Sequence, residues 1–189
     1  VTIMTMIGAL LTSLVMAREY ERGTLESLFV TPVGSGEILT AKAATNFLLG
    51  MVSLAISMVF AAFVFDIPIR GSLLLLLAVS ALFLIVALGL GLVISTATKN
   101  QFLACQFAIM GTFMPALMLS GFLYDILNMP PAVRAVTYLI PARYYVTLLQ
   151  TLFLAGDIPS VIIPCCITLG VFAVVLMSIA RLKAPKSLE

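Results

Sequence analysis

The stretch SLLLLLAVSALFLIVALGLGLVISTAT, from Ser72 to Thr98, contains no charged residue. A helix needs about 20 consecutive apolar residues to cross the roughly 30 Å hydrocarbon core of a bilayer. Because lipid offers the backbone no hydrogen-bonding partner, a single spanning segment of this kind must be α-helical. This stretch therefore predicts a transmembrane helix with enough length to tilt.

Further apolar stretches lie at residues 1–17, 43–65, 102–120 and 161–180. Of the 189 residues, 62% are hydrophobic and 10% are charged, whereas a soluble domain has about 45–50% and about 25%. We therefore expect an all-α, polytopic transmembrane helical bundle with five spans, in which residues 1–189 form a single domain. The first stretch begins without Met or a polar lead-in, so we expect the chain to be part of a longer protein.

Charges concentrate in residues 18–42, between the first and second spans. Loops rich in Lys and Arg stay in the cytoplasm. If residues 18–42 are cytoplasmic, alternation of the spans places seven basic residues inside and three outside. The inner set is Arg18, Arg22, Lys42, Lys99, Arg181, Lys183 and Lys186, and the outer set is Arg70, Arg134 and Arg143.

Within this charged segment, Leu25, Leu28 and Phe29 recur at helical spacing, and Thr24 is suited to cap the helix. A second helix is expected to start at Ser35 and to continue into the next span. One interpretation is an interfacial helix that lies flat at the lipid headgroups. The other is a lever that sits in a groove of a soluble partner and transmits force. The residues alone leave both open.

Two runs resemble a known family. EYERGTLESLFVTPV (Glu19 to Val33), followed by GEILTAK (Gly36 to Lys42), looks like the coupling-helix signature of bacterial type-2 ATP-binding-cassette (ABC) exporter permeases of the multidrug type. SGFLYDILNMPPAVRAVTYLIPARYY (Ser120 to Tyr145) is similar to the segment between that family's last two spans. The resemblance covers essentially the whole chain and departs from the family pattern at Tyr124 and Asp125.

This resemblance implies a multi-pass permease of the bacterial inner membrane that exports a hydrophobic or amphipathic substrate, drug-like or lipid-like. It implies six spans in the complete permease, with an upstream span and an external domain. It also implies a homodimer, or a heterodimer with a related permease, bound to cytoplasmic ATPase subunits that hold ATP and Mg. The coupling residues by match to the motif are Glu19, Glu21, Arg22, Gly23, Thr24, Leu25, Glu26, Leu28 and Phe29.

Residues 121–159 are too interrupted by prolines to form a confident span. We expect Asn128 to cap a short helix that starts at Pro130-Pro131, and Tyr138, Tyr144 and Tyr145 to sit at the membrane interface. The segment is either an interfacial anchor or, as the resemblance implies, a re-entrant helical segment that forms an external gate. The gate residues expected from the resemblance are Ser120, Gly121, Asn128, Met129, Pro130, Pro141, Arg143 and Tyr144.

Several chemistries have no support in the sequence. There is no histidine, which excludes Ser-His catalysis and His-metal ligation. No phosphate-binding Gly-x-x-x-x-Gly-Lys-Ser/Thr motif is present, so we expect no enzyme activity and no cofactor in this chain. A net charge of +2 gives no basic stripe for nucleic acid. The alternatives to an exporter are a non-transporting membrane scaffold or assembly subunit and an ion-coupled secondary carrier, although the spans lack central ionisable residues.

Small and polar residues inside the spans predict helix packing. Ala87, Gly91 and Ser95 form a small-xxx-small ridge that permits close approach of another helix. Interhelical hydrogen bonds are the expected role of the polar residues in the spans, which are Ser53, Ser57, Ser80, Gln106, Thr112 and Thr168. For Gln106, helix packing is favoured over a place on a transport path.

Overall fold

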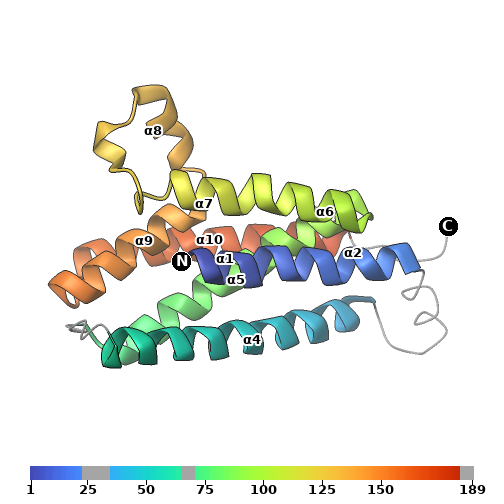
Figure 1. Ribbon diagram of the computed structural model, residues 1–189, viewed down its shortest axis with the longest axis horizontal. Helices are drawn as coiled ribbons and strands as arrows, with labels where there is room; N and C mark the ends of the chain where they lie inside the picture. Colours follow the sequence, from blue (N-terminus) through green and yellow to red (C-terminus); the bar gives the residue numbers. More distant parts are fainter. Residues whose placement is uncertain (23–34, 65–70, 184–189) are drawn as a thin grey trace.

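The computed structural model describes residues 1–22, 35–64 and 71–183. Every regular element in these ranges is helical. In chain order they are α1 (Thr2–Thr5), η1 (Met6–Leu11), α2 (Thr12–Arg22), α4 (Ser35–Phe63), α5 (Leu73–Thr98), α6 (Gln101–Ala108), η2 (Ile109–Phe113), α7 (Met114–Met118), η3 (Ile126–Asn128), α8 (Pro131–Thr137), α9 (Pro141–Gln150), η4 (Thr151–Ala155) and α10 (Pro159–Lys183). The predicted all-α bundle is confirmed (Figure 1).

Among the described residues, four helical stretches are long and apolar enough to cross a membrane: Ala41–Ala61, Leu73–Thr98, Gln101–Met118 and Pro159–Leu182. The predicted first span is occupied by α1, η1 and α2, which follow one another without a break and lie in the same bundle. The third stretch likewise joins α6, the π-helical η2 and α7 into one rod. The total of five spans and their limits remain a prediction.

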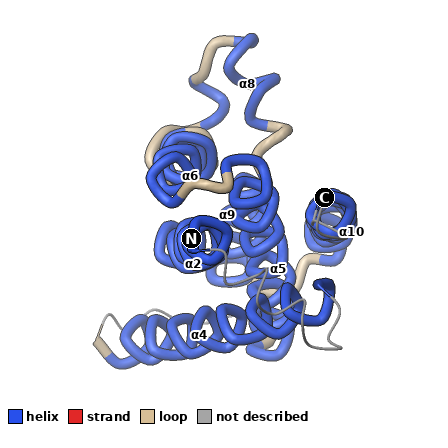
Figure 2. Tube along the Cα trace, turned by 90° about the vertical axis from the view of Figure 1, so that its right-hand side faces the viewer, coloured by secondary structure: helices blue, strands red, loops and turns tan. Residues whose placement is uncertain are grey.

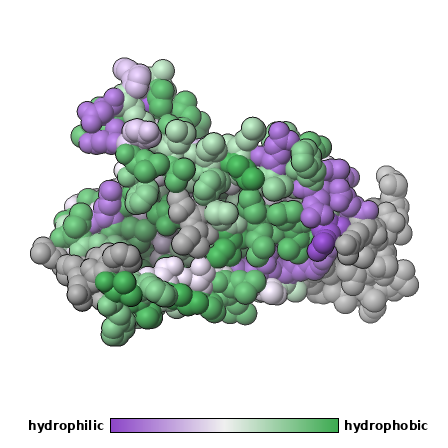
Figure 3. Space-filling model, in the orientation of Figure 1, coloured by the Kyte–Doolittle hydropathy of each residue, from purple (hydrophilic) through white to green (hydrophobic). Residues whose placement is uncertain are grey.

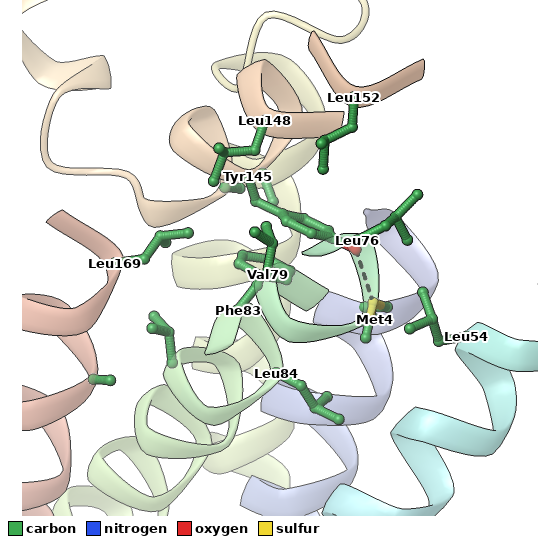
Figure 4. Close-up of a cluster of buried hydrophobic side chains, with 14 of the residues drawn as sticks. Met4, Leu54, Leu76, Val79, Phe83, Leu84, Tyr145, Leu148, Leu152 and Leu169 are labelled. Carbon is green, nitrogen blue, oxygen red and sulfur yellow. Dashed lines mark hydrogen bonds between the residues drawn. The ribbon is translucent and has the colours of Figure 1, made fainter. Parts of the chain in front are cut away.

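Helix α5 is the centre of the bundle. Half of its most apolar window is buried, against 17–22% for the other three candidate spans. It packs against α10, α2, η1, α4 and α9, and it supplies much of the main apolar cluster, including Leu76, Phe83 and Leu84 (Figure 4). The most apolar sequence in the chain is therefore surrounded by protein, while the outer helices keep apolar faces for lipid or for a partner.

Small residues allow a close crossing between η1–α2 and α5. A Cβ atom added to Gly8 would lie 2.5 Å from the Ala87 Cβ, and one added to Gly91 would lie 2.6 Å from the Ala9 carbonyl oxygen. Both distances are far inside van der Waals contact, so the two backbones meet with no room for a side chain. The predicted small-residue ridge on α5 is confirmed as a helix-packing surface.

Short connections hold the long helices at both ends. Lys99 ends α5 in a left-handed conformation, with φ of 50°, and Asn100 caps α6 by accepting a hydrogen bond from the Leu103 N–H at 3.1 Å. At the opposite end, the Ser72 N–H donates to Asp157 Oδ1 at 3.0 Å. The start of α5 is thereby tied to the link between η4 and α10.

The ends of four helices that carry charged residues gather at one end of the bundle. Met16, Ala43, Leu92 and Ala180 pack together, so the adjoining ends of α2, α4, α5 and α10 meet at one end of the bundle. We call this the coupling end. In Figure 3, hydrophilic residues gather at this end and also on the segment that contains α8, while hydrophobic residues cover most of the middle of the face shown. At the other end, α8 stands clear of the bundle (Figure 2).

Candidate functional site

The segment between α7 and α10 is anchored through Tyr145 on α9. Its side chain is 1% exposed, and its ring stacks on Phe83 with centroids 4.2 Å apart and planes 9° apart. The Tyr145 hydroxyl donates to the Met4 sulfur at 3.3 Å and lies 2.9 Å from the Ser80 hydroxyl (Figure 4 draws the bond to Met4). Between the two hydroxyls, either Ser80 or Tyr145 can donate the hydrogen bond. One side chain thus joins α9 to α5 and α1.

This position corrects the expectation that Tyr145 sits at the membrane interface. Two consecutive residues on a helix point about 100° apart, so Tyr144 and Tyr145 are buried to different extents. Tyr144 is half-buried, and Tyr138 is exposed. A signal was present in the sequence, because Ala142, Tyr145 and Val146 follow the i, i+3, i+4 spacing of a buried helical stripe, and all three are buried.

Four residues lock the link between α8 and α9. Arg143 Nη1 donates to the hydroxyl of the fully buried Thr137, and its guanidinium carbon lies 3.9 Å from the centre of the Tyr138 ring. The Tyr144 hydroxyl donates to the Tyr138 carbonyl at 3.0 Å. Hydrogen bonding and charge from Arg143 lower the pKa of the Tyr138 hydroxyl below its ordinary value. We call Thr137, Tyr138, Arg143 and Tyr144 the α8–α9 lock.

Of the remaining gate residues, Pro141 is the first residue of α9, and the others lie between α7 and α8. Gly121 has a φ of 84°, which favours glycine, and the Ile126 side chain lies against its open face. Ser120 is 1% exposed, and its hydroxyl has no hydrogen-bond partner among the described residues. Asn128 ends η3 and does not cap α8, because Pro130 occupies the cap position. Within the described residues, hydrogen bonds join Arg143 and Tyr144 to the lock but do not join Ser120 or Asn128 to it.

At the coupling end, both described acidic candidates are engaged within the chain. Glu19 pairs with Lys42 of α4. Glu21 Oε1 accepts a hydrogen bond from the Gln101 N–H at the start of α6, at 3.0 Å. Deeper in the bundle, the Asn46 amide donates to the Thr12 hydroxyl at 2.9 Å. These contacts join α2 to α4 and α6, and sequence reasoning identified none of the three.

The other coupling candidates are not placed. Arg22 ends α2, and its side chain is not described. Six lie in residues 23–34, outside the described ranges, and these are Gly23, Thr24, Leu25, Glu26, Leu28 and Phe29. The helix expected from Ser35 onward is present, since α4 runs from Ser35 into the second apolar stretch.

Of the polar residues predicted to bridge helices, Ser80 does so through Tyr145. The hydroxyls of Ser57, Thr112 and Thr168 instead donate to carbonyls four residues earlier in their own helices. Back-bonding of this kind satisfies a hydroxyl in lipid without a partner helix. The Gln106 side chain is exposed on α6.

Residues 1–154 match the family described as ABC-2 type transporter. The chain is 49% identical over 187 residues to a "Probable multidrug ABC transporter permease YbhS" of Escherichia coli K12, covering 99% of this chain and 50% of that protein. It is 31% identical over 158 residues to the "Probable multidrug ABC transporter permease YbhR" of the same organism, covering 82% of this chain and 42% of that protein. It is 29% identical over 185 residues to the "Inner membrane transport permease YhhJ", also from E. coli K12, covering 97% and 49%.

The chain thus spans about half the length, or less, of these curated relatives. The match and the apolar helices together place it in the bacterial inner membrane as a multi-pass protein. The chain belongs to the ABC-2 type transporter family of membrane permeases.

Proposed function

We propose that the complete protein is the membrane permease subunit of an ATP-driven ABC exporter, and that residues 18–42 are its coupling segment. ATP and Mg²⁺ are bound and used by separate cytoplasmic ATPase subunits. The cargo is a hydrophobic or amphipathic compound that leaves the cytoplasm. The E. coli relatives named as multidrug permeases support this cargo class.

The proposal rests on the contacts between the two helices that flank residues 23–34. The helices on either side of them, α2 and α4, are joined by the Glu19–Lys42 ion pair and the Asn46–Thr12 hydrogen bond. A force applied to residues 23–34 therefore acts on both helices together. A lever needs such a stiff base, whereas an interfacial helix in lipid headgroups does not.

The mechanism follows from differential binding. A partner shifts a conformational balance only by contacting the two states differently. When ATP draws two ATPase subunits together, contacts at Glu26, Leu28 and Phe29 favour the permease state in which α2 and α4 have moved with them. In a homodimer or heterodimer of permeases, this movement opens a path between the two protomers.

The external segment is the outer gate in this scheme. The α8–α9 lock fixes α8 relative to α9 through Arg143, while Tyr145 holds α9 to the bundle. Opening toward the outside requires the lock, α9 or both to shift. Export then becomes one-way, because the lock closes again when the ATPase subunits separate.

The test is reconstitution of the complete permease with its candidate ATPase in liposomes, with a fluorescent hydrophobic dye as cargo. Glu26→Ala and Phe29→Ala should each lower ATPase stimulation and dye transport severalfold. Arg181→Gln is the matched control, because Arg181 is exposed at the same end of the bundle. Transport that continues without ATP and collapses with an ion gradient would point to a secondary carrier. ATPase binding without any transport would point to a scaffold.

A further inference from the structure

Glu21 lies in the last turn of α2, directly before residues 23–34, and its carboxylate reaches the neighbouring helix. Its Oε1 accepts a hydrogen bond from the Gln101 backbone N–H at 3.0 Å. Gln101 is the first residue of α6, and 80 residues of chain separate the two partners. The bond is therefore a tertiary contact between α2 and α6.

The contact provides an acceptor for a backbone N–H group at the start of α6. The first four N–H groups of a helix have no partner inside that helix, and the helix dipole favours negative charge at that end. Asn100 satisfies one of these groups by accepting from the Leu103 N–H. Glu21 satisfies another at Gln101 and brings a negative charge. Helix α6 is thus capped jointly by its own Asn100 and by a residue of α2.

Helix α6 leads from this cap to the external segment. It continues through η2 and α7 to Met118, two residues before Ser120. Along the way α6 packs against α2, η2 lies against η1, and α7 lies against α9, which carries Arg143 and Tyr145. The cap therefore joins the base of the coupling segment to a continuous rod that ends beside the candidate gate (Figure 1).

We propose that Glu21 is a positioning residue that carries movement of the coupling segment into the α6–η2–α7 rod, and that it does not contact the ATPase. This inference rests on the proposed exporter function, and it changes the role assigned to Glu21 by resemblance. Together with the Glu19–Lys42 pair, this contact connects the end of α2 to two different helices. Glu19 binds α4, and Glu21 binds α6.

The first experiment tests the bond without any transport assay. Hydrogen–deuterium exchange of the complete permease is followed in the peptide that contains Gln101. Glu21→Ala should speed exchange of the Gln101 amide by about 2- to 10-fold, the factor that a hydrogen bond of ordinary net strength implies. Glu21→Gln keeps an acceptor oxygen and should restore most of the protection. Arg18→Ala, an exposed change on the same helix, should leave exchange as it is. Equal exchange in all variants would overturn the proposal.

The second experiment separates coupling from docking in the reconstituted exporter. Glu21→Ala should keep ATPase subunits bound in the normal ratio while the number of cargo molecules moved per ATP falls severalfold, and Glu21→Gln should recover it. Glu26→Ala should lose the ATPase subunits. If Glu21→Ala also loses them, Glu21 belongs to the docking surface and the inference is wrong, although the exporter function stands. If Glu26→Ala keeps both binding and transport, the proposed docking function itself fails.

Discussion

The ring of Tyr145 on α9 stacks on the ring of Phe83 on α5, with centroids 4.2 Å apart, and this contact attaches α9 to the central helix. Both side chains are 1% exposed, and the Tyr145 hydroxyl is shared by Ser80 and Met4. The proposed outer gate is attached to the bundle through this contact. The contribution of Tyr145 to the free energy of unfolding is therefore the first quantity to measure.

Two substitutions of Tyr145 should destabilise the bundle by different amounts. Tyr145→Phe keeps the stacked ring and loses the hydroxyl contacts, at a cost of about 1 kcal/mol. Tyr145→Ala also leaves a cavity beside Phe83 and should cost about 3–5 kcal/mol. Thermal unfolding of the permease in nanodiscs measures both. Tyr124→Phe is the control, since Tyr124 is exposed. If Tyr145→Ala has the same melting temperature as this control, Tyr145 is not an anchor.

Adding one methyl group at the crossing of η1 and α5 should destabilise the protein. In Gly8→Ala, the new Cβ would lie 2.5 Å from the Ala87 Cβ, so the helices must separate. Overpacking of this kind costs about 1–3 kcal/mol, which should lower the melting temperature of the purified permease. Gly170→Ala on α10 is the matched control, because outside the adjacent backbone no atom of the described residues lies within 4 Å of its added Cβ. It should be neutral or slightly stabilising, and equal losses at both positions would contradict the packing described.

The α8–α9 lock should reveal itself in a pH titration. Arg143 lowers the pKa of Tyr138, so the folded protein favours the phenolate more than the unfolded chain does. The added stability is complete above the ordinary tyrosine pKa of about 10 and is lost as the pH falls through the lowered value. Phenolate absorbance, taken as the difference between wild type and Tyr138→Phe, gives the midpoint. In an Arg143→Gln background the midpoint should rise, and an unchanged midpoint would count against the lock.

The Glu19–Lys42 pair predicts rescue by exchange of charge. Glu19→Lys and Lys42→Glu each place like charges together at the base of the coupling segment. Each should lower the melting temperature, by a modest amount because partly exposed pairs contribute about 0.2–1 kcal/mol. The double variant restores an attractive pair and should recover part of the loss. Thermal unfolding of all four proteins measures this, and losses that simply add would show that the two side chains do not interact.

The sequence predicted the elements that depend on local composition. The uncharged stretch from Ser72 to Thr98 became the central helix, and the ridge of Ala87 and Gly91 became a close contact, because small residues at i, i+4 leave room for a neighbouring backbone whatever the topology. The helix ends that carry Arg18, Lys42 and Arg181 also meet at one end of the bundle, because Met16, Ala43, Leu92 and Ala180 pack together there.

Tertiary choices could not be predicted in the same way. The spacing of Ala142, Tyr145 and Val146 marks Tyr145 as the buried one of two adjacent tyrosines, but no residue pattern reveals that it stacks on Phe83 of another helix. From the sequence, Glu21 resembles a docking residue. Its partner in the structure is the backbone N–H of Gln101, 80 positions away, and no residue pattern reveals that contact. The π-helical turns η1, η2 and η4 likewise lack a clear sequence signal, because they differ from α-helix only in backbone hydrogen bonding.

The central claim is that residues between α2 and α4 face the cytoplasm and dock on a separate ATPase. The most direct measurement is cross-linking from Ser27→Cys in the complete permease, with Cys105, Cys165 and Cys166 replaced. The account predicts that position 27 is labelled only by reagents that reach the cytoplasmic side, and that it forms a cross-link to the ATPase subunit whose yield changes when ATP is added. Labelling from the outside, with no adduct to the ATPase, would contradict it.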